Sequence, residues 1–238
     1  MRLSIIIPLY NEENSILNVL NRLENLSFPA FLSQVEIVVV DDKSLDKSKE
    51  VVADYISNSK YEIRLITHEN NTGKGGAVRS GIESSNGELI LVQDADLELD
   101  PPDILKMLQV MNDLGMDFIN GSRYMAGISR PLSSFKRYMG NRVFTLLTSW
   151  IINVKISDVA CGYKLFKRSL LEQFVLRENR FGFEAELIIK SMRINRFKIA
   201  EVPVQYFPRT VTQGKKLRNM DGIKILFVII KYGLFKAK

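Results

Sequence analysis

The first 121 residues alternate short apolar runs with amphipathic stretches of helical length. The apolar runs cover Leu3–Pro8, Val35–Val40, Tyr61–Thr67, Glu88–Gln93 and Asp117–Asn120. They are rich in Ile, Val and Leu and show little polar alternation, which is typical of strands buried on both faces of a parallel sheet. Helix-like segments lie between them, near residues 13–25, 45–58, 76–85 and 102–114. This alternation predicts an α/β fold with a mostly parallel, doubly wound sheet flanked by helices.

The second half of the chain is less regular and more basic. A basic amphipathic stretch covers Ser134–Val154, and an apolar stretch with interspersed lysines covers Ile223–Phe235. Between them we expect a helix near residues 182–194 and a strand near residues 197–202. The sequence contains no repeat and no low-complexity linker. We therefore expect no separate second domain, and we expect the chain to end in basic amphipathic helices.

The net charge of +6 hides a strong asymmetry between the two halves of the chain. Residues 1–121 carry 10 basic and 20 acidic side chains, whereas residues 122–238 carry 23 basic and 7 acidic ones. Acidic side chains suit a cation, and basic side chains suit phosphates or an anionic membrane. The two halves are therefore expected to meet different partners.

Cysteine, histidine and hydropathy exclude several classes of protein. Cys161 is the only cysteine, which excludes an intrachain disulfide framework and indicates a reducing compartment. His68 is the only histidine, which argues against His-rich zinc sites. No apolar run reaches about 18–20 residues, so the sequence predicts no membrane-spanning helix. The N-terminus lacks a small-residue cleavage site, so we expect no signal peptide.

Acidic residues follow the fourth apolar run. Asp94, Asp96 and Glu98 are spaced by two, so in an extended chain their side chains face one site, and the small Ala95 lets them approach each other. Carboxylates that close repel, and a divalent cation relieves the repulsion. Oxygen ligands without nearby His or Cys favour Mg²⁺ or Mn²⁺. The alternative is a solvated acidic loop.

Other chain segments add polar groups to the same expected edge. Asp42 follows the second run, and it either binds a ligand or caps the next helix. The loop Gly73–Gly76 precedes a helix, and it either approaches a phosphate or forms a tight packing turn. It matches neither the Walker pattern nor GxGxxG. Arg123 directly follows the fifth run and should point into the cleft, where arginine can clamp phosphate.

Two apolar stretches have an interfacial composition. Residues 144–152 contain the only tryptophan and follow a basic cluster, and Ile223–Phe235 mixes large apolar residues with lysine and tyrosine. Neither is long enough to span a bilayer, but each could lie in the headgroup plane. The alternatives are a core helix and an oligomer interface. Nucleic acid is a poorer partner, because no aromatic stacking platform accompanies the basic residues.

These motifs together resemble the family 2 glycosyltransferases of the GT-A fold. The resemblance rests on Ile5-Ile6-Ile7-Pro8-Leu9-Tyr10-Asn11-Glu12, Val38-Val39-Val40-Asp41-Asp42-Lys43-Ser44, Gly73-Lys74-Gly75-Gly76-Ala77 and Asp94-Ala95-Asp96. Their order and spacing cover the N-terminal half. Within the family the chain is similar to the dolichyl-phosphate hexosyltransferases, and the segment Cys161–Phe166 is closer to the glucosyl type than to the mannosyl type.

The resemblance implies roles for the matching residues. It assigns the nucleotide sugar to Pro8, Tyr10, Glu12, Val40, Asp42, Asp94, Ala95, Asp96, Arg209 and one of the two lysines Lys215 and Lys216. It implies that Asp94, Asp96 and Glu98 hold the metal. It also implies that Asp96 acts on the metal and diphosphate, that Arg123 contacts a donor or acceptor phosphate, and that Arg137 lies near the lipid phosphate.

The function that this resemblance implies is inverting transfer of a hexose from a nucleotide sugar, first of all UDP-glucose, to a polyprenyl phosphate. Residues 1–121 would bind the nucleotide sugar, and residues 122–238 would bind the acceptor and the membrane, with the enzyme peripheral on the cytoplasmic face. Three alternatives stay open: GDP-mannose as donor, a soluble sugar acceptor with a base such as Asp158, and a non-catalytic binding module. The sequence does not define the oligomeric state.

Overall fold

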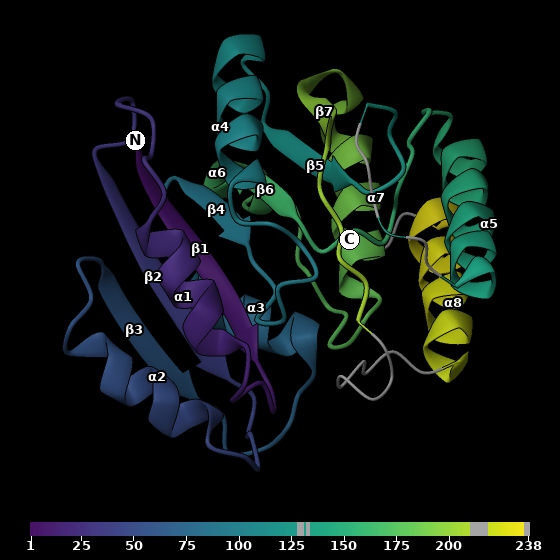
Figure 1. Ribbon diagram of the computed structural model, residues 1–238. Coiled ribbons are helices and arrows are strands. Elements are labelled where there is room, and N and C mark those ends of the chain that lie inside the picture. The colour runs from purple at the N-terminus through teal and green to yellow at the C-terminus, as the bar shows by residue number, and fades with distance from the viewer. Residues whose placement is uncertain (128–130, 132–133, 210–218, 236–238) are drawn as a thin grey trace.

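The computed structural model describes residues 1–127, 131, 134–209 and 219–235. Within these residues the strands are β1 (Arg2–Leu9), β2 (Gln34–Asp41), β3 (Glu62–Thr67), β4 (Leu89–Val92), β5 (Phe118–Ser122), β6 (Lys164–Lys167) and β7 (Ile199–Pro203). They form one sheet in the order β3-β2-β1-β4-β6-β5-β7 (Figure 1). All run in the same direction except β6, which is antiparallel to β4 and β5. The predicted α/β class with a mostly parallel sheet is confirmed.

The strand order reverses between β1 and β4. The chain passes from β1 to β2 and β3 on one side, and then returns to β4 on the other side of β1. Ligands bind to open α/β sheets beyond the carboxyl ends of the strands at such a point. The carboxyl ends of β1 and β2 lie at the lower edge of the sheet in Figure 1, so a site is expected there.

Helices cover both faces of the sheet. One face carries α1 (Ile16–Glu24), α2 (Ser48–Ile56) and α4 (Asp103–Leu114), and the other carries α3 (Lys74–Glu83), α6 (Arg168–Leu171) and α7 (Phe183–Asn195). Alternate side chains of β1 serve the two cores: Ile5 and Ile7 face the first, and Ile6 faces the second. Burial on both faces explains why the parallel strands are continuously apolar.

Two further helices form an outer layer beside α7. α8 (Asn219–Leu234) packs against α7, and α5 (Phe135–Ile152) packs against α8. Figure 1 shows both helices together at one side of the molecule. In the described part of the chain, no helix has the length and apolarity that crossing a membrane requires.

The sequence predicted most elements to within a few residues, but it missed β6, α6 and the 3-10 turn η1 (Arg196–Lys198). β6 begins with Lys164, which lies fully buried among the strands. Its Nζ donates to the Asn120 side-chain oxygen and to the Cys161 carbonyl oxygen, both at 2.6 Å. Burial lowers the pKa of Lys164 and raises that of the Cys161 thiol to about 11. A short strand with a lysine at each end has no apolar period from which to predict it.

Candidate active site

Asp42 follows β2 and fixes the loop that leads into α3. Its carboxylate accepts hydrogen bonds from the Thr72 backbone N–H at 2.8 Å, the Thr72 hydroxyl at 2.9 Å and the Gly73 N–H at 2.7 Å. The His68 ring nitrogen Nδ1 lies 2.8 Å from the same carboxylate. Asp42 therefore holds the loop in place, and its contact with a nucleoside stays a prediction.

The glycines of this loop allow another backbone segment to approach. Gly73 has a φ of 91°, and a Cβ on it would lie 2.6 Å from the Asn179 carbonyl oxygen. The Gly76 N–H donates to that same oxygen at 3.1 Å. One early N–H of α3 is thus used by the protein itself. Of the two interpretations of Gly73–Gly76, this geometry supports the packing turn.

Lys74 joins two carboxylates beside this loop. Its Nζ lies 2.6 Å from Asp94 Oδ1, after β4, and 2.7 Å from Glu184 Oε1, in the first turn of α7. Burial alone would lower the pKa of Lys74, but the two carboxylates outweigh it and raise the pKa. Lys74 is therefore a permanent cation between Asp94 and Glu184.

Arg209 bridges two other predicted site residues. Its guanidinium donates to both carboxylate oxygens of Glu12, at 2.8 and 2.9 Å, and to Asp96 Oδ2 at 3.0 Å. Glu12 follows β1, Asp96 follows β4, and Arg209 lies beyond β7. The structure thus brings together three residues that the sequence singled out separately. Lys215 and Lys216 lie outside the described residues.

Glu98 holds the segment that carries Arg209. Its carboxylate accepts from the Arg209 backbone N–H at 2.7 Å and from the Tyr206 hydroxyl at 3.1 Å. Its carbonyl oxygen accepts from the Phe207 N–H at 2.8 Å. Glu98 therefore positions Arg209 in this structure, and its role as a metal ligand stays a prediction.

Residues 94–98 do not continue β4 as an extended chain, which corrects one premise of the sequence prediction. β4 ends at Val92, and Leu97 has a left-handed φ of 56°. Side chains two residues apart share a face only in an extended chain, and this segment is not extended. Asp94 pairs with Lys74, whereas Asp96 pairs with Arg209. Across the described residues, no three His, Cys, Asp or Glu side chains are grouped as a metal site.

The Asp96 carboxylate is partly buried and has two other carboxylates near it. Burial and the neighbouring Asp94 and Glu98 raise the pKa of Asp96 to about 6, against the lowering effect of Arg209. A carboxyl group in this condition gains from an additional cation. The oxygen donors of Asp94 and Asp96 are of the type that Mg²⁺ and Mn²⁺ prefer.

Arg123 follows β5 and is held by Asp158. Its Nε and one terminal nitrogen donate to the two Asp158 oxygens at 2.7 and 2.9 Å, and Asn141 donates to the same carboxylate at 3.1 Å. Burial alone would raise the pKa of the fully buried Asp158, but Arg123 outweighs it and lowers the pKa. A carboxylate enclosed in this way is poorly placed to take a proton from a sugar hydroxyl, which disfavours Asp158 as a base.

Aromatic rings link Arg123 to the start of α5. The Arg123 guanidinium lies 5.5 Å from the Tyr124 ring centre and 5.1 Å from that of Tyr206. Tyr124 packs edge-on against Tyr138, with ring centres 5.4 Å apart. Arg137 is exposed next to Tyr138 in the first turn of α5. Arg137 thus neighbours in sequence the ring that is linked to Arg123, and its contact with the lipid phosphate stays a prediction.

The remaining predicted residues lie at the carboxyl edge of the central strands. Pro8 on β1 and Val40 on β2 are register partners, and Tyr10 follows β1 partly buried. The Ala95 carbonyl oxygen accepts a hydrogen bond from Ser15 at 2.9 Å. These positions agree with the predicted nucleoside end of the site, and the contacts themselves stay predictions.

Sequence reasoning missed the partnership of Lys74 with Glu184. Glu184 lies 110 positions after Lys74 in the chain, at the start of a helix, where acidic residues are common because they complement the helix dipole. The sequence offered one signal for such an ion pair, which is the position of Lys74 inside the glycine loop. Its ion-pair partners depend on the packing of α7 against α3, which no local pattern encodes.

Comparison with solved structures identifies the fold. The chain superposes on glucosyl-3-phosphoglycerate synthase from Mycobacterium tuberculosis with a TM-score of 0.75 and 16% identity, over 98% of this chain and 80% of that one. At this identity the similarity concerns the fold alone. The mostly parallel sheet flanked by helices is the GT-A fold, as expected.

Comparison of sequences identifies the family. Residues 4–175 match the model of Glycosyl transferase family 2, and the chain belongs to that family. It is 34% identical to human dolichyl-phosphate beta-glucosyltransferase, over 97% of this chain and 76% of the relative. It is 26% identical to the UDP-N-acetylglucosamine–dolichyl-phosphate N-acetylglucosaminyltransferase of Methanococcus voltae, over 98% and 96% of the two chains. The predicted family is confirmed.

Proposed function

We propose that this glycosyltransferase moves a hexose from a nucleotide sugar, first of all UDP-glucose, to a polyprenyl phosphate at the cytoplasmic face of a membrane. The observation that carries the proposal is the cluster of Asp94, Asp96 and Arg209 at the switch point of the sheet, because Arg209 offers a cation to a diphosphate and the two carboxylates can hold the divalent cation that a diphosphate binds. The names of the human and Methanococcus voltae relatives, which specify dolichyl-phosphate as acceptor, support the acceptor class.

A divalent cation fits the residues present. Asp94 and Asp96 would hold Mg²⁺ or Mn²⁺, with the donor phosphates completing the shell, as is usual for Mg²⁺. The chemistry of the donor set favours this fit, because both ligands are carboxylates and both lie on the short segment that follows β4. The Mycobacterium tuberculosis synthase was solved with Mn²⁺ and UDP-glucose, which supports a metal of this kind. When bound, the cation would stabilise the negative charge of the departing diphosphate.

The acceptor chemistry fits a site without a general base. A phosphate monoester is mostly anionic at neutral pH, because its second pKa is about 6. One of its oxygens can attack the anomeric carbon while the bond to the diphosphate breaks, with inversion and without proton removal. Arg209 and Lys74, which pair with Asp96 and Asp94, would stabilise the leaving group, and the enclosed Asp158 would not be required as a base.

Glu184 would serve the sugar end of the donor, next to Lys74 at the diphosphate. The nucleoside would lie at β1 and β2 and the diphosphate at the end of β4. Lys74 joins Asp94, after β4, to the start of α7, so the hexose would extend toward α7. Glu184 begins α7, and one of its oxygens lies 2.7 Å from Lys74. A carboxylate held there can accept hydrogen bonds from sugar hydroxyls.

The test is a transfer assay with the purified full chain. Radiolabelled UDP-glucose or GDP-mannose is incubated with detergent-dispersed undecaprenyl or dolichyl phosphate and with Mg²⁺ or Mn²⁺, and the lipid product is extracted. We expect a lipid-linked hexose from UDP-glucose, its loss on chelation, and its loss in Asp96→Ala. Folded protein that labels no lipid with either donor would refute the proposal, and full activity of Asp96→Ala would refute the metal assignment.

Arg137 provides the matched variant on the acceptor side. Arg137→Ala should raise the acceptor KM and leave nucleotide binding unchanged, because Arg137 is exposed in the first turn of α5, whereas the carboxylates follow β1 and β4. An unchanged acceptor KM would remove Arg137 from the acceptor site without affecting the donor assignment.

A further inference from the structure

Lys164 is a buried cation that the proposed reaction does not use. It is the first residue of β6, and its side chain is fully buried. Burying a charged side chain costs free energy unless the charged group is hydrogen-bonded. An apolar side chain of similar size, such as methionine, would fill the same space without that cost. A lysine at this position therefore indicates a role beyond filling the core.

The place of Lys164 in the sheet lies between two strand ends of the site. β6 is antiparallel to β4 and β5, so it begins near the edge at which those strands end. Lys164 is the register partner of Val92, the last residue of β4, and of Asn120 on β5. Asp94 follows β4, and Arg123 follows β5. Lys164 is thus embedded between the two strands that carry these site residues.

The ammonium group of Lys164 fixes the orientation of the Asn120 side-chain amide. A lysine ammonium only donates hydrogen bonds, so the amide oxygen of Asn120 faces Nζ, at 2.6 Å. The amide nitrogen then donates to the Asp158 carbonyl oxygen and to a Glu201 carboxylate oxygen, both at 2.8 Å. Because those two oxygens only accept, the opposite orientation of the amide would place oxygen against oxygen.

Lys164 also holds the other end of the segment Asp158–Cys161. Its Nζ donates to the Cys161 carbonyl oxygen at 2.6 Å, while Asn120 holds the carbonyl oxygen of Asp158. The Asp158 carboxylate in turn accepts from Arg123, at 2.7 Å from Nε, 2.9 Å from a terminal nitrogen and 3.1 Å from the backbone N–H. The place of the Arg123 guanidinium therefore depends on the Lys164 ammonium group.

The ring contacts of Arg123 connect it with the expected acceptor side. Its guanidinium lies 5.5 Å from the Tyr124 ring centre, and Tyr124 packs against Tyr138 in α5. Arg137, which is expected near the lipid phosphate, is the sequence neighbour of Tyr138. The residues expected at the nucleoside lie instead at the ends of β1 and β2. A displaced Arg123 should therefore affect the acceptor more than the nucleotide.

We propose that Lys164 is a positioning residue of the transfer reaction, which holds the Arg123 guanidinium in place for the acceptor phosphate through Asn120 and Asp158. Because Lys164 is fully buried, it acts without contact with either substrate. The proposal rests on the proposed function in one respect, which is that Arg123 contacts the acceptor phosphate.

The experiment compares wild type with Lys164→Met in steady-state transfer by the purified full chain, with UDP-glucose, Mn²⁺ and detergent-dispersed undecaprenyl phosphate. We expect the acceptor KM to rise at least about tenfold, because a charged contact is misplaced. The Kd for UDP, measured by calorimetry, should stay unchanged. If circular dichroism shows that Lys164→Met does not fold, Lys164→Gln, which is shorter and uncharged, replaces it with the same expected result.

A second background separates positioning from a general effect on the fold. Arg123→Gln removes the guanidinium that Lys164 is proposed to position. In that background Lys164→Met should raise the acceptor KM no further, whereas it should lower the melting temperature in both backgrounds. A rise of the acceptor KM by the same factor in both backgrounds would overturn the proposal.

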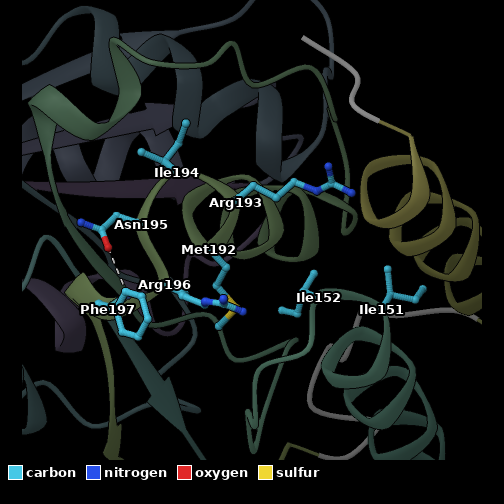
Figure 2. A pocket seen from close by; sticks show the side chains of 8 residues that line it. All are labelled: Ile151, Ile152, Met192, Arg193, Ile194, Asn195, Arg196 and Phe197. Atoms are coloured by element: carbon cyan, nitrogen blue, oxygen red, sulfur yellow. Dashed lines mark hydrogen bonds between the residues drawn. The ribbon is translucent and has the colours of Figure 1, made fainter.

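The control is Met192→Ala, a core substitution away from the site. Met192 is buried in α7 beside a hollow of about 380 Å³, whose walls include Ile151 and Arg196 (Figure 2). The hollow adjoins η1, which precedes β7, so it lies at the amino edge of the parallel strands, whereas Arg123 follows β5 at their carboxyl edge. Met192→Ala should lower the melting temperature and leave the acceptor KM unchanged. A comparable rise of the acceptor KM in Met192→Ala would overturn the proposal, because loss of stability alone would then explain the effect.

The Nε–H group of Arg123 provides a measurement that does not require activity. Hydrogen-bonded to Asp158, it should give a separate signal in proton–nitrogen NMR spectra, identified by its loss in Arg123→Gln. Lys164→Met should shift or broaden this signal, and Met192→Ala should not.

These measurements distinguish the positioning role of Lys164 from the proposed function. Wild-type chain that transfers no hexose would refute the proposed function, and an unchanged Arg123 signal in Lys164→Met would then still overturn the positioning role. Active wild type with the same acceptor KM as Lys164→Met would refute the positioning role alone.

Discussion

At the scale of single residues, Gly162 shows how closely the site is packed. A Cβ on Gly162 would overlap the Asp94 carboxylate, with the Asp94 Cγ only 3.0 Å away. Gly162→Ala should therefore displace Asp94 from Lys74 while leaving the fold intact. We expect kcat/KM for transfer to fall about a hundredfold, the cost typical of misplacing a reacting group by about 1 Å.

The control for this substitution is Gly140→Ala. A Cβ on Gly140 meets nothing within 4 Å, and Gly140 lies inside helix α5. Alanine there should leave kcat/KM unchanged and raise stability by up to about 1 kcal/mol. Wild-type kcat/KM in Gly162→Ala would show that the placement of Asp94 beside Lys74 is not needed for transfer.

The buried ion pairs of Glu36 on β2 should make the stability of the fold depend on pH. The Glu36 carboxylate lies 2.6 Å from both Arg2 and Arg64 and accepts from the Asn86 N–H at 2.6 Å. Burial alone would raise its pKa, but these partners and Ser4 lower it below the ordinary 4.5. A lowered pKa stabilises the fold above pH 4.5, and this contribution is lost as pH falls through the folded-state pKa.

Glu36→Gln should accordingly lower the free energy of unfolding by about 3 kcal/mol at pH 7, the cost of breaking a buried ion pair. Denaturant titrations at pH 7 and pH 3 should show the difference from wild type shrinking at the lower pH. Glu62 pairs with the same two arginines but is exposed, so Glu62→Gln should cost less than about 1 kcal/mol. Equal losses of the free energy of unfolding in Glu36→Gln and Glu62→Gln would contradict the conclusion that the buried Glu36 stabilises the fold more than the exposed Glu62 does.

At the scale of elements, what the sequence predicted depended on whether the signal was local. The parallel strands are buried on both faces, so β1 and β2 were visible as runs of Ile and Val. β6 was invisible because its buried Lys164 is stabilised by Asn120 and the Cys161 carbonyl, which are contributed by other segments. A sequence pattern places a lysine at the surface, and only tertiary contacts such as these allow it to be buried.

The site was predictable in its members but not in its contacts. The strand-end position of Asp94 and Asp96 follows from the pattern, because the carboxyl ends of parallel strands share one edge. The turn at Ala95 and Asp96, which ends the extended chain after β4, leaves no apolar signature. The pairing of Glu12 with Arg209 spans 197 residues, and no periodicity reports on a contact of that range.

The first turn of α7 offers a prediction that joins three elements. Glu184 on α7 is tied through Lys74 on α3 to Asp94 after β4. If Glu184 binds sugar hydroxyls, Glu184→Gln should lower kcat/KM for the nucleotide sugar about 10- to 100-fold, since hydrogen bonds to charged groups contribute about 1.5–3 kcal/mol. Steady-state transfer kinetics measure this loss.

The affinity for UDP alone distinguishes sugar binding from a structural role. UDP lacks the hexose, so Glu184→Gln should bind UDP as wild type does in calorimetry, and Glu184→Asp should recover part of the activity. A parallel loss of UDP affinity and thermal stability would mean that Glu184 only supports the packing of α7 on α3.

At the scale of the whole molecule, the asymmetry of charge along the chain becomes an asymmetry in space. The carboxylates of the first half that matter for the site are Glu12, Asp94 and Asp96, and each is paired with a buried or half-buried cation. The basic residues of α5 are exposed on the surface. Salt therefore acts on the two regions differently, because exposed charges are screened far more than buried pairs.

This difference predicts how salt affects the two substrates. Raising NaCl from about 0.1 M to about 1 M shortens the screening length from about 10 Å to about 3 Å. The KM for polyprenyl phosphate in anionic vesicles should rise at least tenfold, because the basic residues of α5 no longer attract the surface. The KM for the nucleotide sugar, measured with detergent-dispersed acceptor, should change less than about threefold, because Arg209 and Lys74 are enclosed with their carboxylates. With vesicles of phosphatidylcholine alone, the KM for polyprenyl phosphate should depend little on salt. An equal rise of both KM values with salt would contradict the distinction between the exposed charges of α5 and the enclosed charges of the donor site.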